Sequence, residues 1–259
     1  MENKKGLIIT IVILSILVIG LASFIVYDKK LFQEKKENTK TVIDDVNIDL
    51  NALYQIGNTL NYIDNAFNDQ NSQYFGYIYN TKKLTVEKMD VGAAIYATVH
   101  DELIASNTLQ TIPEKRVKNN FEKMFGTSIK YAPVEIKSGE YYKIIYDPIN
   151  KNYNYIVPVK NNFPTSGYMT KNIKTSLVED KVVIKRKVFY VEYTIDYNTA
   201  IIYKTADKQQ KVGEIQLINK ELSASEIVSK YGSNLNTYEV TFKQKKEDEY
   251  VFSRIEQVK

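Results

Sequence analysis

The feature that most constrains this chain is the uncharged, apolar run at residues 6–27, which reads GLIITIVILSILVIGLASFIVY. A helix of this length, at ~1.5 Å per residue, spans roughly 33 Å and can cross the ~30 Å hydrocarbon core of a bilayer. Two lysines precede the run, and Tyr27, an aromatic residue typical of a membrane interface, ends it before Asp28-Lys29-Lys30. We predict a transmembrane helix at residues 6–27, with the lipid bilayer as the partner of this segment.

Three other interpretations of an apolar N-terminus compete with an uncleaved anchor. A cleaved signal peptide could use Gly20-Leu21-Ala22 as its small-x-small site, but the apolar run continues beyond Ala22. A lipoprotein needs a cysteine after the apolar run, and the chain has none. A pilin-like segment carries Glu at its fifth apolar position, where this chain has Ile11. The anchor is favoured, and cleavage after Ala22 stays open.

The lysines around the apolar run leave two membrane orientations to weigh. A literal positive-inside count gives more weight to Lys29, Lys30, Lys35, Lys36 and Lys40 and places the C-terminal part in the cytoplasm. A short basic tail followed directly by an apolar run has the form of a signal anchor. We favour the signal anchor and predict a single-pass protein of the cell membrane with an extracytoplasmic C-terminal domain.

Composition excludes several classes of chemistry. The chain has no Cys and one His, which rules out thiolate zinc sites, iron–sulfur clusters and disulfides and makes a His-rich metal centre improbable. The net charge of +4 is spread thinly, so nucleic acid is not an expected partner. Only three of the 35 basic residues are Arg, a usage typical of AT-rich genomes and hence of a low-GC bacterium.

Helical patterns occupy the first part of the chain after the charged stretch 28–46, which we interpret as a stalk. Leu53, Ile56, Leu60, Ile63 and Phe67 recur at spacings of three and four and predict a helix over 47–67, capped by Asn47 or Asp49. Two further helices are expected over 86–105 and from Pro113 to Gly126. The short aromatic segment 74–80 is interpreted as a strand or an extended segment.

From residue 129 onward the pattern changes to a period of two. Strands are expected over 141–146, 153–159, 174–178, 182–197, 200–204, 211–219, 238–243 and 250–258, with a short helix that starts at Ser223 or Ser225 and ends at Gly232. Short connections favour antiparallel pairing. The expected fold class is therefore α+β: the N-terminal transmembrane helix, then a helical segment followed by a mostly antiparallel sheet.

The expected organisation is a cytoplasmic tail at 1–5, the transmembrane helix at 6–27, the stalk at 28–46, a helical subdomain at 47–127 and a β-rich subdomain at 128–259. The order of helix and then sheet also suggests a cystatin-like or nuclear-transport-factor-like cone, an analogy at the level of the fold alone.

The common catalytic motifs are absent from the sequence. No P-loop, no G-x-G-x-x-G, no G-x-S-x-G and no H-E-x-x-H occurs. Asp45, Asn47 and Asp49 have the spacing of a calcium loop, but Leu50 stands where Gly is needed and Ile56 where the bidentate Glu belongs. We therefore assign no catalytic, cofactor-binding or metal-ligating residue and expect no cofactor.

His100 is the one histidine and could act as a general base oriented by Asp101 or Glu102. Residues one and two apart on a helix do not face each other. We favour a structural, hydrogen-bonded His100 on the apolar face of the helix over a catalytic one.

Three groups of charged or aromatic residues have a structural and a functional interpretation as well. The acidic pairs Asp44-Asp45, Glu179-Asp180 and Glu247-Asp248-Glu249 fit solvated turns better than paired catalytic carboxylates. Lys185-Arg186-Lys187 could contact anionic wall polymers or lipid headgroups, but the favoured interpretation is charge on an edge strand. The six tyrosines between Tyr131 and Tyr155 are interpreted as sheet residues and not as a ligand platform.

One arrangement of residues resembles a known group. Phe125-Gly126, then Ile129-Lys130-Tyr131, then Tyr146-Asp147 and Tyr153, is similar to membrane-anchored extracytoplasmic proteins of low-GC Gram-positive bacteria. In that group a helix ends in Phe-Gly, a hairpin follows, and the second half is rich in Tyr. The resemblance implies an anchored surface domain and transfers no activity and no site residues.

Two functions from different classes follow as hypotheses. The first is a membrane-anchored extracytoplasmic binding or scaffold protein of the bacterial cell envelope, with an envelope protein or wall polymer as partner. The alternative is an envelope enzyme or a small-ligand-binding cone whose site the sequence does not reveal. The absence of a catalytic motif favours the first.

Overall fold

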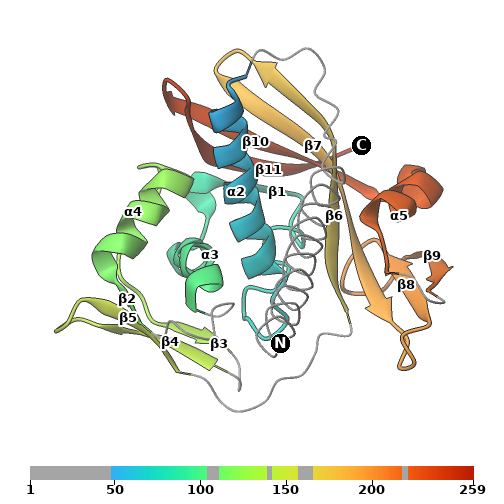
Figure 1. The fold of residues 1–259 in the computed structure, drawn as a ribbon, viewed down its shortest axis with the longest axis horizontal. Helices are drawn as coiled ribbons and strands as arrows, with labels where there is room; N and C mark the ends of the chain where they lie inside the picture. The colour runs from blue at the N-terminus through green and yellow to red at the C-terminus, as the bar shows by residue number, and fades with distance from the viewer. Residues whose placement is uncertain (1–47, 104–110, 139–141, 157–165, 218–220) are drawn as a thin grey trace, which may run out of the picture. The chain divides into compact units, whose positions relative to one another are not determined.

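Four α-helices and two antiparallel sheets make up the described part of the chain, which confirms the α+β fold class (Figure 1). The computed structural model describes residues 48–103, 111–138, 142–156, 166–217 and 221–259. The predicted transmembrane helix at 6–27 and the stalk at 28–46 lie outside the described residues. Within the described ranges, no helix combines the length and apolarity that a membrane crossing needs.

The larger sheet has seven strands, and β7 (Lys181–Tyr193) lies inside it. One edge of β7 pairs with β6 (Ser166–Val178). The other edge pairs first with β10 (Asn236–Lys246) and then with β8 (Thr199–Tyr203). The remaining strands are β9, β11 and β1, at Lys211–Gln216, Glu249–Val258 and Lys83–Thr85.

The position of β7 corrects one prediction. Lys185-Arg186-Lys187 lies between two paired neighbours, so its charges do not protect an edge strand. The predicted strands 174–178, 182–197, 238–243 and 250–258 are present with different lengths, and β1 was not predicted. Residues 218 and 219 of the predicted strand 211–219 lie outside the described residues.

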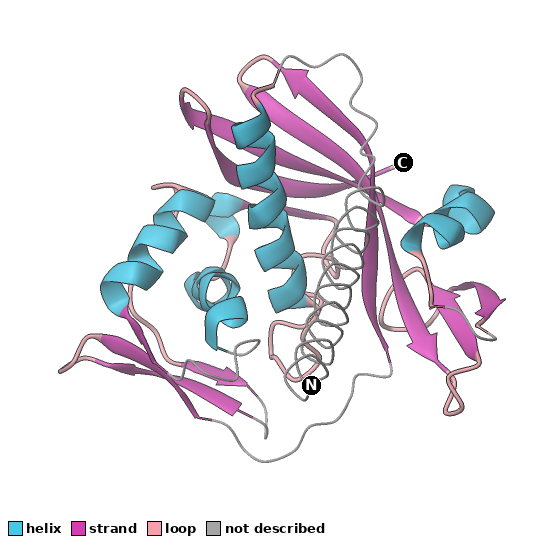
Figure 2. Cartoon of the chain, viewed as in Figure 1, coloured by secondary structure: helices cyan, strands magenta, loops and turns pink. Residues whose placement is uncertain are grey.

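The smaller sheet has the order β2-β5-β4-β3 and forms a second group of strands in Figure 2. Its central hairpin, β4 (Tyr142–Asp147) and β5 (Asn152–Ile156), confirms the predicted one, although residues 141 and 157–159 lie outside the described residues. Its outer strands, β2 (Thr111–Pro113) and β3 (Ile136–Ser138), were not predicted. Each has only three residues, too few to show a period of two.

Helix α2 (Leu50–Phe67) forms where the spacing predicts it. The Asp49 carboxylate accepts hydrogen bonds from the backbone N–H groups of Asn51 and Ala52, which confirms Asp49 as the cap. Four of the five periodic residues are buried, and Leu53 is half-buried. Helix α2 therefore presents one apolar face to the rest of the domain.

Helix α3 (Val91–Leu103) begins five residues later than predicted because a 3₁₀ turn, η1 (Val86–Lys88), occupies the expected start. The Asp90 carboxylate caps α3 by accepting from the N–H of Ala93 at 2.9 Å. Residues 92–100 are all buried, so α3 is surrounded by protein instead of presenting one apolar face. Residues 104 and 105 lie outside the described residues.

The last two helices lie at different ends of the large sheet (Figure 1). Helix α4 (Glu114–Phe125) buries the predicted stripe, and its Phe125 ring packs 6.1 Å from Phe252 of β11. Helix α5 (Ala224–Tyr231) is capped by Ser223, as predicted, and its Ile227 joins a second apolar cluster with Phe189.

The predicted extended segment at 74–80 is wrong: the chain forms consecutive turns there. The N–H of Gly76 reaches back to the carbonyl of Phe67 at 2.7 Å, and the N–H groups of Tyr79 and Asn80 bond to the carbonyl of Gly76. Gly76 has a φ of +67°, which favours glycine. Aromatic residues favour a strand locally, but the backbone hydrogen bonds around Gly76 hold this segment in turns.

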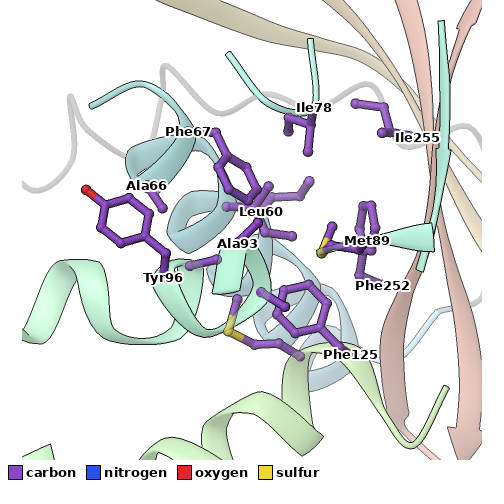
Figure 3. Packing of buried hydrophobic residues seen from close by; sticks show 14 of the residues in the cluster. Leu60, Ala66, Phe67, Ile78, Met89, Ala93, Tyr96, Phe125, Phe252 and Ile255 are labelled. Atoms are coloured by element: carbon purple, nitrogen blue, oxygen red, sulfur yellow. The ribbon is translucent and has the colours of Figure 1, made fainter. Parts of the chain in front are cut away.

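The main core fills the space between helices α2, α3 and α4 and the large sheet. Figure 3 shows Leu60 and Phe67 of α2 close to Ala93 of α3, with Phe252 and Ile255 of β11 on the sheet side. These side chains are at most 3% exposed. Burial of apolar surface is the main source of stability in such a core.

A buried charged group connects α2 to β7 inside this core. Arg186, 3% exposed, donates to both carboxylate oxygens of Asp64, at 3.1 and 2.6 Å. Tyr79 and Thr170 donate to the same carboxylate. Burial raises the pKa of Tyr79, and the charge of Asp64 raises it further, so the hydroxyl keeps the proton that it donates.

We expect Arg186→Met to lower the free energy of unfolding by about 3–5 kcal/mol, because it leaves the Asp64 carboxylate without its cation. Urea unfolding of the full-length protein measures the change. Lys181→Met on the same strand is the control, because Lys181 forms only exposed ion pairs, worth about 0–1 kcal/mol. A second variant, Asp64→Leu with Arg186→Met, should be more stable than Arg186→Met alone. Equal effects of the Lys181 and Arg186 variants would contradict the prediction.

Replacing two glycines by alanine should change the free energy of unfolding in opposite directions. Gly126, after α4, has φ 68° and ψ −146°, a region almost restricted to glycine, so Gly126→Ala should cost about 1–3 kcal/mol. Gly57 lies inside α2, and a Cβ there meets nothing within 4 Å, so Gly57→Ala should stabilise by about 0.5–1 kcal/mol. Thermal unfolding of both variants checks the signs, and a stabilising Gly126→Ala would refute the first.

Candidate functional site

A pocket of about 710 Å³ lies at the end of the large sheet where β10 begins and β11 ends, and it includes part of the face that points away from α2. Residues in register across an antiparallel sheet share a face. Lys187 of β7, Thr237 of β10 and Val258 of β11 form one such row, and all three line the pocket. Arg186, between Lys185 and Lys187 in sequence, points to the opposite face and reaches Asp64. Alternation along β7 therefore separates the two lysines from the arginine.

Four lysines line this pocket, which we call the lysine pocket: Lys82, Lys185, Lys187 and Lys259. Lys187 Nζ donates to Thr237 Oγ1 at 2.8 Å. Burial lowers the pKa of Lys187, and the positive charge of Lys185 lowers it further. In the part of the chain that the structure describes, Lys185 has no ion pair. The pocket thus holds several ammonium groups that a bound anion would stabilise.

The rest of the lining is polar or aliphatic. Ser233, Asn236, Thr237 and Gln257 supply hydroxyl and amide groups, and Gln257 donates to Asn236 at 3.1 Å. Among the described residues that line the pocket, none has an acidic or aromatic side chain. The combination of cations and hydrogen-bond donors without acidic side chains among the described lining residues fits an anionic ligand.

Two glutamates share the sheet face with the lysine pocket but do not line it. Glu239 of β10 lies opposite Lys185 in register, and Glu256 of β11 lies opposite Glu239. Glu256 already contacts Lys83 at 3.3 Å and Arg254 at 3.6 Å. Glu239 is therefore the acidic group best placed to weaken the positive potential at Lys185.

Part of this site could be predicted from the sequence. Lys185 and Lys187 stand two apart in a predicted strand, which places them on one face. Lys82 and Lys259 had no such signal. Lys82 joins the pocket through the pairing of β1 with β11, whose paired residues are 169 to 173 positions apart in sequence, and Lys259 joins it through the pairing of β11 with β10. The polar residues of 233–237 could not be placed without that pairing.

His100 is buried and faces two carboxylates. Its Nδ1 lies 2.7 Å from Asp101 Oδ1, and its Nε2 lies 3.6 Å from Asp69 Oδ2. His100 and Asp101 do meet although they are adjacent on the helix, so the prediction that their side chains do not face each other is wrong. Tyr96 donates to Asp69 at 2.6 Å, so Asp69 lies between Tyr96 and His100. With both nitrogens directed at carboxylates, the ring has a structural contact on each side.

The tyrosines of the small sheet pack against α4. The hydroxyls of Tyr131 and Tyr153 lie 3.0 Å apart, and Tyr146 donates to Glu114 at 2.6 Å. Tyr153 is completely buried, and the Tyr131 ring contacts Phe121. Tyr146 and Tyr153 are strand residues, as predicted, whereas Tyr131 lies in the loop before β3 and is not a sheet residue.

The acidic pairs lie in turns where the structure describes them. Glu179 and Asp180 both lie near Lys181 Nζ, and Glu249 contacts Lys246. The pair Asp44-Asp45 lies outside the described residues. Among the described residues, no group of three His, Asp or Glu side chains could hold a metal ion.

The chain matches no protein-family model, no curated protein and no solved structure.

The contacts of His100 predict a specific dependence of stability on pH. Burial acts to lower the pKa of His100, but the hydrogen bonds to Asp101 and Asp69 outweigh it, so the pKa lies above 6.5. The stabilisation is complete below the unfolded pKa and is lost as the pH rises through the raised folded pKa.

Urea unfolding of the full-length protein between pH 6 and pH 9 should therefore show a free energy of unfolding that falls with pH, by at most about 1.4 kcal/mol per pH unit for one proton. In His100→Gln this part of the slope should disappear. Identical slopes in the two proteins would show that His100 does not gain a proton on folding.

Proposed function

We propose that this protein is a membrane-anchored extracytoplasmic binding protein of the bacterial cell envelope, and that the lysine pocket is its binding site. The observation that carries the proposal is the pocket itself, a concavity of about 710 Å³ with several unneutralised cations. Ligand sites in proteins have volumes of roughly 300–1,000 Å³. Anionic polymers are abundant at a bacterial surface, which makes a wall polymer a better partner than a protein scaffold.

The anchor and the orientation belong to this proposal. Residues 6–27 have the length and apolarity of a membrane helix, and the basic tail before them has the form of a signal anchor. The resemblance to anchored proteins of low-GC Gram-positive bacteria supports the same location. The domain that carries the pocket would then lie outside the membrane, next to the wall.

Binding is favoured over catalysis by how the reactive groups are used. Both nitrogens of His100 face carboxylates, and Arg186 is held by Asp64. A general base needs a nitrogen or oxygen within reach of a substrate proton. The lysines of the pocket offer charge and donors, which serve recognition.

The cystatin-like or nuclear-transport-factor-like cone is the second candidate, for a small ligand held between helix and sheet. The long helix α2 against an antiparallel sheet favours this analogy. In this chain, however, Ile63, Phe67 and Val240 fill the space between α2 and the sheet, each at most 1% exposed. We therefore prefer the opposite face of the sheet as the binding face.

A reporter fusion at Lys259 tests the anchored orientation. We expect an alkaline-phosphatase fusion to be active, a green-fluorescent fusion to be dark, and the protein to stay in the membrane pellet after alkaline carbonate extraction. Deletion of residues 6–27 is the control and should release the protein from the membrane. Phosphatase inactivity together with cytoplasmic fluorescence would overturn the proposed location.

A further inference from the structure

We propose that the lysine pocket binds a chain of phosphate groups, either a polyphosphate or a phosphodiester polymer without bases. This inference rests on the proposed function, since it names the ligand class of the same site. It goes further because it names phosphate as the anion and a chain as the form of the ligand.

The spacing of the cations favours a chain. Lys185 and Lys187 lie two positions apart on β7, which places their backbones about 6.6 Å apart along the strand. Lys259, just after β11, and Lys82, just before β1, line the pocket two and three strands away from β7. A ligand with charges along its length can engage each ammonium separately, whereas one small anion must draw them together against their mutual repulsion.

The type of cation is compatible with phosphate. Lysine is a compact point charge with rotatable donors and is a common phosphate ligand in proteins. Only lysines supply cations to this pocket within the described residues, and the nearest arginine in sequence, Arg186, is turned to the other face. The hydroxyls of Ser233 and Thr237 add neutral donors for phosphate oxygens.

The lining disfavours nucleic acid. Proteins that bind single strands stack the bases on aromatic rings, each worth about 1–3 kcal/mol. The described lining residues include Ile173, Leu235 and Val258 but no aromatic ring. Phosphate recognition is present without a surface for bases.

Isothermal titration calorimetry of the full-length protein in neutral detergent tests the inference, with short-chain inorganic polyphosphate as the probe. We expect Lys185→Gln with Lys187→Gln to weaken binding about tenfold, because two of the four pocket charges are lost. The matched control is Lys243→Gln with Lys245→Gln, which removes the same charge from the far end of β10 and should change affinity less than about twofold. Both variants should keep the wild-type melting temperature.

A gain-of-affinity variant separates the pocket from general electrostatics. Glu239 faces Lys185 in register, so Glu239→Gln should strengthen polyphosphate binding about two- to fivefold, and added salt should weaken it. The site would be overturned if both double-lysine variants weakened polyphosphate binding equally, or if Glu239→Gln did not strengthen it.

Further probes in the same binding experiment test the choice of ligand. Poly-glutamate that binds as tightly as polyphosphate would overturn the phosphate assignment, and glycerol 3-phosphate that binds as tightly would overturn the chain. Tighter binding of oligothymidine than of polyphosphate would identify nucleic acid instead. If none of these probes binds while the reporter fusions report an extracytoplasmic domain, the ligand class fails and the proposed location stands. If the domain is cytoplasmic and still binds polyphosphate, the proposed location fails and the ligand class stands.

Discussion

The fold depends on one ion pair, between Asp64 in the last turn of α2, which is partly exposed, and the buried Arg186 in the middle of β7. Each charge is costly to bury alone, so the helix and the strand can approach only in the register that brings the two together. Tyr79 and Thr170, which come from two other segments, also donate hydrogen bonds to the Asp64 carboxylate. Apolar burial supplies most of the stability, but this pair fixes where α2 crosses the sheet.

The same strand explains the candidate site. Successive residues of β7 alternate between the two faces of the sheet. Arg186 therefore points into the core, where Asp64 neutralises it, while its neighbours Lys185 and Lys187 point to the other face. Arg186 is the planar, bidentate cation and is used where a single carboxylate must be held in place. Lys185 and Lys187, on the other face, have no carboxylate in the pocket lining.

How far the sequence predicts this structure depends on the range of each interaction. Helices α2, α4 and α5 and the β4–β5 hairpin follow from caps, periodicity and turns, which are local. The pairing of β1 with β11 and the central place of β7 depend on contacts between distant residues, so the sequence suggested an edge strand where the structure has an inner one. The contact of His100 with Asp101 was not predicted for another reason. Spacing rules describe the directions of the Cβ atoms and not where the polar ends of the side chains lie.

The lysine pocket exists only when distant segments have paired. Lys82 and Lys259 reach β7 through β1, β11 and β10, whereas Lys185 and Lys187 are already on it. In the unfolded chain these four ammonium groups are far apart and offer no common site. A ligand that needs all four therefore binds the folded state alone, and its binding must stabilise the folded sheet by mass action. Recognition in this protein thus depends on the pairing of β1 with β11, between residues 169 to 173 positions apart in sequence.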